Sequence, residues 1–275
     1  MSSDPASANA NLPKFICVGA QRAGTTWLHE CLKDHPDICM PKVKELHFFD
    51  RHYEEGLQSY GQNFTDELIG SAQTWGEITP NYYQEPNALE RIKQDIPKVK
   101  IIYVIREPVS RAFSQYQLYA LTLYKGLSFE EVIQSKPTVT DLSMQGKHLE
   151  RIYELFDKED VLVLFYDDIE KDPRTLIKRV YTFLGVNPGY VPGPINTRVN
   201  RVVLPGLQSW LTKLKLGWFI ELVKRSPFSE LIKSAFHKKS KPSSGTAKPT
   251  LSADTFADDI RKIEALTQVN LKHWR

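Results

Sequence analysis

The chain has 275 residues, which is enough for one α/β domain with a sizeable core or, alternatively, for two small domains. Hydrophobic residues make up 41% and charged residues 25% of it, as is usual for a globular protein, and the net charge of +3 is too small to indicate nucleic-acid binding. The three cysteines form no CxxC pair, which argues against a disulfide framework and favours a reducing compartment.

The first dozen residues are small and polar, and they lack the basic and apolar regions of a signal peptide. No stretch approaches the roughly 20 apolar residues that a membrane span needs. We therefore expect residues 1–12 to be disordered and the protein to be cytoplasmic, without a transmembrane segment.

From residue 14 onward, short apolar runs alternate with amphipathic segments. The runs Phe15–Gly19, Lys100–Ile105 and Val161–Tyr166 are too short for helices and are typical of strands buried on both faces of a parallel sheet. Helical patterns lie around them, at Thr25–Lys33, Ser110–Tyr124, Phe129–Ser135, Leu149–Phe156 and Pro173–Leu184. This alternation predicts an α/β fold of three layers, α/β/α, with a central and mostly parallel sheet.

The C-terminal third has a different character. A proline- and glycine-rich loop follows residue 188, and residues 207–236 carry apolar and basic side chains at helical spacing. The basic stretch 237–248 reads as flexible, and a last amphipathic helix is expected at Ala253–Leu266. We predict a single domain over residues 13–275, in which 207–248 is a basic helical lid or insertion with a flexible end.

The most informative stretch is Phe15–Leu28, where a predicted strand runs through Gly19-x4-Gly24-Thr25-Thr26 into a helix. Glycines let the backbone approach an anion, and the free N–H groups of the helix N-terminus can then bind it, so the segment is P-loop-like. A nucleoside-triphosphate P-loop has lysine where this chain has Thr25, and the loop's one cation is Arg22. The sequence therefore predicts a phosphate site that differs from that of ATP-binding enzymes.

Five segments resemble, in the same order, those of the sulfotransferases that use 3′-phosphoadenosine 5′-phosphosulfate (PAPS), in particular the heparan sulfate-type and bacterial branches. They are GAQRAGTTWL, PKVKELHFFD, GEITPNYY, IIYVIREPVSRAFSQY and FYDDIEKDP with the later FLGV. The resemblance implies transfer of a sulfuryl group from PAPS to a hydroxyl or amine of a carbohydrate, lipid or other small-molecule acceptor. It implies no metal ion.

The resemblance also assigns the residues that would bind PAPS. Arg22 lies where the family usually has a catalytic lysine, and the rest of its loop would bind the 5′-phosphate. Trp27 and Tyr166 match adenine contacts, although both could equally be core residues. The full donor-binding set is Arg22, Ala23, Gly24, Thr25, Thr26, Trp27, Arg106, Ser114, Tyr166 and Arg198, of which Arg106 and Ser114 would hold the 3′-phosphate.

Arg111, between Arg106 and Ser114, is expected to be a structural or peripheral cation. Late in the chain, Arg198 or Arg201 would close on the 3′-phosphate.

On the acceptor side, the resemblance makes Glu45 the general base, with His47 and Asp50 orienting it or the acceptor. The catalytic set is therefore Glu45, His47 and Arg22. The sequence leaves open whether Glu45 or His47 takes the proton.

Two departures from the family pattern bear on activity. Arg22 replaces a lysine of the phosphate loop, and Ile78 replaces the lysine of the family's EKTP segment. A non-catalytic nucleotide-binding protein that kept the family's site therefore stays open as an alternative. A P-loop kinase is disfavoured, because Thr25 replaces its lysine and no convincing carboxylate for Mg²⁺ follows. The acceptor and the oligomeric state are left open.

Overall fold

The computed structural model describes residues 11–197 and 253–275, and its centre is a five-stranded sheet. The strand order is β2-β3-β1-β4-β5, and every pair is parallel. The strands are β1 (Phe15–Gly19), β2 (Ile38–Cys39), β3 (Thr74–Ile78), β4 (Lys100–Ile105) and β5 (Val161–Phe165). Because β1 lies between β3 and β4 and is buried on both faces, its sequence is a continuous apolar run.

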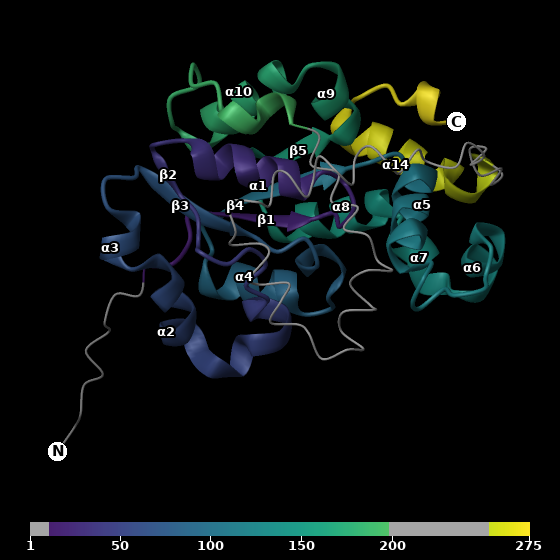
Figure 1. Ribbon diagram of the computed structural model, residues 1–275, viewed down its shortest axis with the longest axis horizontal. Helices are drawn as coiled ribbons and strands as arrows, with labels where there is room; N and C mark the ends of the chain where they lie inside the picture. Colours follow the sequence, from purple (N-terminus) through teal and green to yellow (C-terminus); the bar gives the residue numbers. More distant parts are fainter. Residues whose placement is uncertain (1–10, 198–252) are drawn as a thin grey trace, which may run out of the picture.

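Helices cover both faces of this sheet. In Figure 1, α1 (Thr25–Asp34) and α10 (Pro173–Leu184) lie on one side, and α4 (Ala88–Asp95) and α8 (Gln145–Leu155) lie on the other. Apolar side chains of the strands and of these helices form one core cluster. The predicted three-layer α/β/α fold with a parallel sheet is thus confirmed.

The remaining helices are short or peripheral. A smaller apolar cluster joins the segment that follows β4 to the helices after it, and these form a lobe beside the sheet in Figure 1. The helices not yet named are α2 (Gly56–Gly61), α3 (Asp66–Ile69), α5 (Pro108–Tyr119), α6 (Phe129–Ser135), α7 (Pro137–Asp141), α9 (Tyr166–Lys171) and α14 (Ala257–Thr267), with a π-helical turn at Phe48–His52. Single 3-10 turns lie at Tyr53–Glu55, Gln62–Phe64, Tyr82–Gln84, Lys158–Asp160, Gly193–Asn196, Ala253–Phe256 and Lys272–Trp274.

The helix expected at Ser110–Tyr124 begins and ends earlier than predicted. The Glu107 side chain accepts from the N–H groups of Val109 and Ser110, and Pro108 fits the first turn, so α5 begins at Pro108. It ends at Tyr119, and hydrogen-bonded turns continue the chain. The apolar pattern alone could not locate the cap.

The C-terminal segment packs against α8. The Asp259 carboxylate on α14 accepts from the N–H groups of Gly146 and Lys147, at 2.8 and 2.9 Å. This carboxylate therefore caps the N-terminus of α8, where the helix dipole favours negative charge. Further along, Trp274 Nε1 donates to Asp167 Oδ2 of α9 at 2.7 Å.

Three sequence-based expectations fall partly or wholly on residues outside the described ranges: the disordered N-terminus, the lid or insertion at 207–248, and the late arginine, Arg198 or Arg201. The single-domain organisation stays a prediction. Within residues 11–197 and 253–275, no helix combines the length and the apolarity that crossing a membrane requires.

Candidate nucleotide and acceptor site

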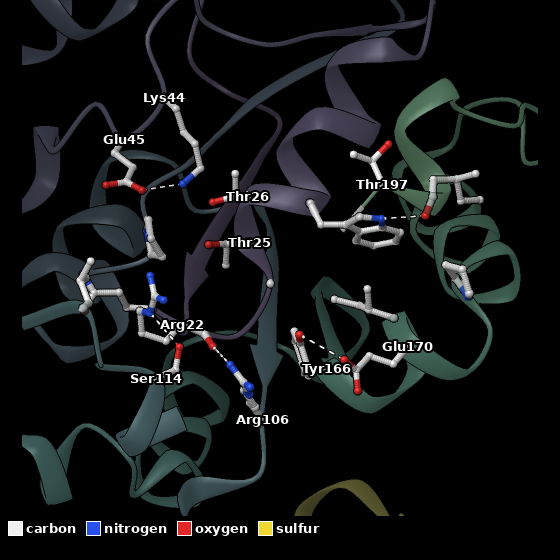
Figure 2. A pocket seen from close by; sticks show the side chains of 18 of the residues that line it. Arg22, Thr25, Thr26, Lys44, Glu45, Arg106, Ser114, Tyr166, Glu170 and Thr197 are labelled. Carbon is white, nitrogen blue, oxygen red and sulfur yellow. Dashed lines mark hydrogen bonds and ion pairs between the residues drawn. The ribbon is translucent and has the colours of Figure 1, made fainter. Parts of the chain in front are cut away.

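The carboxyl ends of the parallel strands meet at one edge of the sheet, and a pocket of about 490 Å³ opens there. In open α/β sheets this edge is the usual ligand site. Most of the predicted site residues line the pocket: Arg22, Gly24, Thr25, Thr26, Trp27, Glu45, Arg106, Ser114 and Tyr166. Figure 2 shows the labelled side chains around the pocket, and they come from loops that follow strands, from the first turn of α1, and from α5 and α9.

The phosphate loop turns into α1 at Gly24, which caps the helix with a φ of 92°. A Cβ at this position would lie 2.6 Å from Ile169 Cδ1 and 3.1 Å from the Tyr166 ring, so the loop packs closely on α9. Glycine therefore meets two requirements here, a left-handed backbone and a close contact. Thr25 and Thr26 of the first turn of α1 line the pocket, and that turn has no acidic residue, an arrangement suited to an anion.

Arg22 projects from this loop and reaches α5, where its Nε donates to Ser114 Oγ at 3.1 Å. Burial lowers the pKa of Arg22, and the neighbouring charge of Arg106 lowers it further. No carboxylate among the described residues pairs with the Arg22 guanidinium. A half-buried cation with a like charge beside it is stabilised when an anion binds.

Arg106 follows β4 and is held from several sides. Its Nη1 donates to the Arg22 carbonyl at 2.9 Å, and its guanidinium lies 4.2 Å from the centre of the Tyr166 ring. Gln145 fixes its backbone, since the side-chain amide accepts from the Arg106 N–H and donates to its carbonyl. The buried Nε–H finds no partner among the described groups, and it is suited to donate to a phosphate oxygen.

Arg111 is fully buried beneath the loop. Its Nε donates to Ser143 Oγ and one Nη to Gln115 Oε1, at 2.9 and 2.5 Å, and a longer bond of 3.4 Å reaches the Gln21 carbonyl. Burial lowers the pKa of Arg111, since the charged guanidinium is removed from water. These contacts fit a structural role for Arg111, one of the two roles expected from the sequence, and the bond to Gln21 links it to the phosphate loop.

The predicted acceptor-side residues form a chain of polar contacts. His47 Nδ1 lies 2.8 Å from Asp50 Oδ2, and His47 Nε2 lies 3.8 Å from Glu45 Oε2. The other Glu45 oxygen, Oε1, is 2.5 Å from Lys44 Nζ. Glu45 and Lys44 line the pocket, whereas His47 is not among its lining residues. The arrangement can orient the Glu45 carboxyl group toward the pocket that it lines.

A buried carboxyl network supports this segment from below. Glu77, at the end of β3, accepts from the hydroxyls of Tyr60, Thr79 and Tyr82 at 2.7, 2.6 and 3.0 Å. Burial raises the pKa of Glu77, against the lowering effect of these donors. Tyr82 Oη in turn accepts from the Phe48 N–H at 2.9 Å.

The hydrogen bonds around Glu77 and Tyr82 lie next to an unusual stretch of backbone that carries the acceptor-side residues. Glu45 and His47 have φ values of 66° and 53°, in the left-handed region that side chains other than glycine rarely adopt. The surrounding hydrogen bonds therefore stabilise an unusual backbone that directs both side chains.

A family model of the sulfotransferase domain matches residues 12–209, which is well over half of the chain. The chain belongs to the sulfotransferase family. The heparan sulfate glucosamine 3-O-sulfotransferase 3B1 of Homo sapiens is 31% identical over 189 residues, covering 66% of this chain and 48% of its own length. The membrane-associated sulfotransferase kil1 of Dictyostelium discoideum is 32% identical over 152 residues, covering 53% of this chain and 32% of that protein. The chain thus spans about a third to a half of these relatives.

Solved sulfotransferases share the fold. The crystal structure of a sulfotransferase from Alicyclobacillus acidocaldarius superposes with a TM-score of 0.67 at 23% identity, over 96% of this chain and 98% of that one. The predicted family is confirmed, and so is the P-loop-like α/β fold.

Two predicted donor-binding residues of this sulfotransferase are less exposed to the pocket than the others. Trp27 is among the lining residues, but its side chain is buried in the core and its indole N–H donates to the Ile195 carbonyl at 3.0 Å. Ala23 is fully buried, and its N–H donates to the Ala20 carbonyl in the turn of the loop. The structure thus does not bring the Ala23 side chain into the site.

Other residues of the sulfotransferase pocket were missed at the level of sequence. Lys44 lies next to Glu45 in the KELHFFD segment, and this position was the available signal. Gln145, which holds Arg106 without lining the pocket, has no signal in the sequence, because the two residues meet only through the fold. Residues added to the pocket by the structure are Gln21, Lys44, Pro80, Leu118, Ile169, Glu170, Pro173, Ile195, Asn196 and Thr197.

Proposed function

We propose that this sulfotransferase binds PAPS in the described pocket and transfers its sulfuryl group to a hydroxyl or amine of a carbohydrate, lipid or other small-molecule acceptor. The observation that carries the proposal is the pair formed by Arg22 and Arg106 at the phosphate loop. Both arginines line the pocket, the charge of Arg106 acts on Arg22, and Arg106 has a buried N–H without a partner among the described groups, so the site is suited to a ligand with more than one anionic group.

The residues of the phosphate loop would hold the 5′ end of the donor. The N–H groups and hydroxyls of Thr25 and Thr26 would donate to the 5′-phosphate oxygens, and Arg22 would neutralise the charge that develops there. When bound, PAPS supplies the sulfuryl group and the phosphate oxygen that leaves. Arg22 stays charged at neutral pH, so its contribution is electrostatic and not a proton donation.

Arg106 and Ser114 would hold the 3′-phosphate, and Tyr166 would contribute an aromatic face beside Arg106. A site with a dedicated 3′-phosphate contact would prefer PAPS to adenosine 5′-phosphosulfate. Arg198 is proposed as a further 3′-phosphate contact from the resemblance alone.

Glu45 would accept the acceptor proton. It lines the pocket, and His47 is held by Asp50 in a position to orient it. Glu45 is favoured over His47 as the base because His47 does not line the pocket. The cytoplasmic location expected from the sequence stays a prediction.

Two measurements test this function. Adenosine 3′,5′-bisphosphate (PAP) should raise the melting temperature of the protein, whereas ATP with Mg²⁺ should raise it far less, since only a ligand that prefers the folded state stabilises it. Labelled PAPS should then transfer its label to an acceptor from a panel of glycans, glycolipids, phenols and hydroxyacyl compounds. Bisphosphate binding without transfer to any acceptor would favour the non-catalytic alternative, and preference for ATP would overturn the proposal.

A further inference from the structure

Lys44 is a pocket residue whose charge the donor-binding and base assignments do not use. Its side chain is 19% exposed and turns inward, with Nζ 2.5 Å from Glu45 Oε1. Lys42, two positions earlier in the same segment, is exposed to solvent. Figure 2 shows the Lys44 ammonium beside Glu45, on the side of the pocket where Thr26, Thr25 and Arg22 also point.

The position that corresponds to the lysine of the family's EKTP segment is apolar in this chain. Ile78 ends β3 and is 1% exposed, so it brings no charge to the pocket. The segment carrying Lys44 runs directly over this strand end. The His47 N–H lies 3.4 Å from Thr79 Oγ1, and Pro80 lines the same pocket as Lys44.

We propose that Lys44 is a catalytic residue that supplies, from the loop after β2, the cation that Ile78 cannot supply from β3. The inference rests on the proposed function. In the free protein Lys44 pairs with Glu45, and with donor bound its ammonium contacts the sulfuryl oxygens while Glu45 faces the acceptor.

The transfer step balances without a further reactant. The bond between sulfur and the bridging oxygen of the phosphosulfate breaks, and its electron pair stays on that oxygen. The acceptor oxygen or nitrogen forms the new bond to sulfur, and its proton goes to the Glu45 carboxylate. Lys44 keeps its proton throughout and stabilises the negative charge shared by the three sulfuryl oxygens. A preorganised donor of this kind contributes roughly 10²–10³-fold to turnover.

The alternative role for Lys44 is a purely structural ion pair with Glu45. The two roles predict different effects of a Lys44 substitution on the affinities for PAP and PAPS, because PAP lacks the sulfuryl group. A catalytic Lys44 affects binding of PAPS and leaves PAP unaffected, whereas a structural one affects both ligands or neither.

The test compares Lys44→Met with Lys44→Arg, and uses Lys42→Met as the matched control on the exposed lysine. Affinities for PAP and PAPS are measured by titration calorimetry without acceptor, and kcat is measured by label transfer. Lys44→Met should keep PAP affinity within about twofold, bind PAPS about tenfold more weakly, and lose roughly 10²–10³-fold in kcat. Lys44→Arg should retain most of the activity, and Lys42→Met should match the wild type.

The outcomes separate this inference from the proposed function. Wild-type protein that binds neither PAP nor PAPS overturns the proposed function and the inference with it. Wild-type protein that binds and turns over, with Lys44→Met equal to it in kcat and in PAPS affinity, overturns the inference alone. Equal weakening of PAP and PAPS by Lys44→Met also overturns it, and assigns Lys44 a structural role.

Discussion

At the scale of single residues, the proposed donor side of the pocket carries arginines that lack carboxylate partners among the described residues. Arg22 and Arg111 both have lowered pKa values because burial penalises their charge. Arg106 keeps one buried N–H unpaired. Such groups are costly in an empty site and gain most when an anion binds, so anion affinity should be concentrated in very few side chains.

Replacing Arg106 with alanine should therefore change nucleotide selectivity. PAP carries the 3′-phosphate and AMP does not, so the variant should lose roughly ten- to a hundredfold in affinity for PAP and much less for AMP. A charge-assisted hydrogen bond contributes about 1.5–3 kcal/mol, which corresponds to that range. Calorimetric titration measures both ligands, and Arg179→Ala, on the exposed surface of α10, is the control. Equal losses for PAP and AMP would remove Arg106 from the 3′ position.

Glu45→Gln should separate binding from chemistry. Glutamine keeps the size of the side chain but cannot accept a proton, so kcat should fall by about 10²–10⁴-fold while PAP affinity stays nearly unchanged. His47→Ala should show a milder loss, because His47 contacts Glu45 without lining the pocket and is proposed only to orient it. If His47→Ala has the larger effect on kcat, His47 is the base. Two variants that both turn over like the wild type would contradict the acceptor-side assignment.

The site could be predicted from sequence where a residue's role follows from a local motif, and not where it follows from a tertiary contact. Arg22, Thr25 and Thr26 belong to one loop, so their convergence was predictable. Gln145 holds the backbone of a residue 39 positions away, and no sequence pattern marks it. Lys44 was overlooked because a lysine in a polar segment usually extends into solvent.

At the scale of elements, the entry into α1 combines a left-handed backbone with close packing on α9. Gly24 and Gly126 have similar φ values, 92° and 83°, but only Gly24 has atoms near its missing Cβ. The pair therefore distinguishes backbone strain from steric contact.

Gly126→Ala should cost about 1–2 kcal/mol, the usual penalty for a left-handed alanine. Gly24→Ala should cost more and should also weaken PAP binding, because the loop must move away from Ile169. Urea denaturation and calorimetry measure the two effects. Equal stability losses together with unchanged PAP affinity for Gly24→Ala would show that the contact with α9 is unimportant.

The buried carboxyl at the end of β3 makes stability depend on pH. Burial raises the pKa of Glu77 above its ordinary value of 4.5. At pH values between the pKa of Glu77 in the unfolded state and its pKa in the folded state, the folded state binds more protons. The contribution of Glu77 to the free energy of unfolding is therefore greatest below the unfolded-state pKa, and it falls as the pH rises toward the folded-state pKa.

Glu77→Gln removes this titration. The difference in unfolding free energy between wild type and Glu77→Gln should therefore shrink as pH increases from about 4.5, the ordinary value for the carboxyl. Urea denaturation at a series of pH values measures it. A difference that grows with pH would mean that the hydroxyl donors, and not burial, dominate the pKa of Glu77.

The elements themselves were predictable to different degrees. The strands β1, β4 and β5 are continuous apolar runs, and their predicted bounds agree with the structure to within one residue. The strand β3 was harder to predict, because its sequence TWGEI mixes polar and apolar residues. Its glutamate, Glu77, is buried and accepts hydrogen bonds from hydroxyl groups outside the strand. For α8, which was expected to begin at Leu149, the true start at Gln145 depends on the cap supplied by Asp259.

At the scale of the whole molecule, the C-terminal segment supports the donor side of the pocket. Asp259 caps the helix that begins with Gln145, and Gln145 holds Arg106. Trp274 binds Asp167, which follows Tyr166 in the first turn of α9. Both contacts involve residues beyond position 209, where the family match ends.

Asp259→Asn should lower the melting temperature and weaken PAP binding together. The hydrogen bonds of such a cap contribute about 1 kcal/mol to stability. Because the Asp259 side chain is buried, the amide of asparagine can replace only part of this contribution. Asp258→Asn, whose side chain is 93% exposed, is the matched control and should leave both quantities unchanged. A destabilised Asp259→Asn protein with wild-type PAP affinity would confine Asp259 to stability.

This support has a consequence for the order in which the protein is made. Asp259 meets α8 across 113 residues of chain, and Trp274 meets Asp167 across 107. Synthesis proceeds from the N-terminus, so the phosphate loop and every strand of the sheet leave the ribosome well before the residues that brace them. A nascent chain arrested before residue 257 would hold Gln145 and Tyr166 without their anchors. Nucleotide affinity should therefore be acquired only after residues 257–275 have been translated, and not together with the sheet.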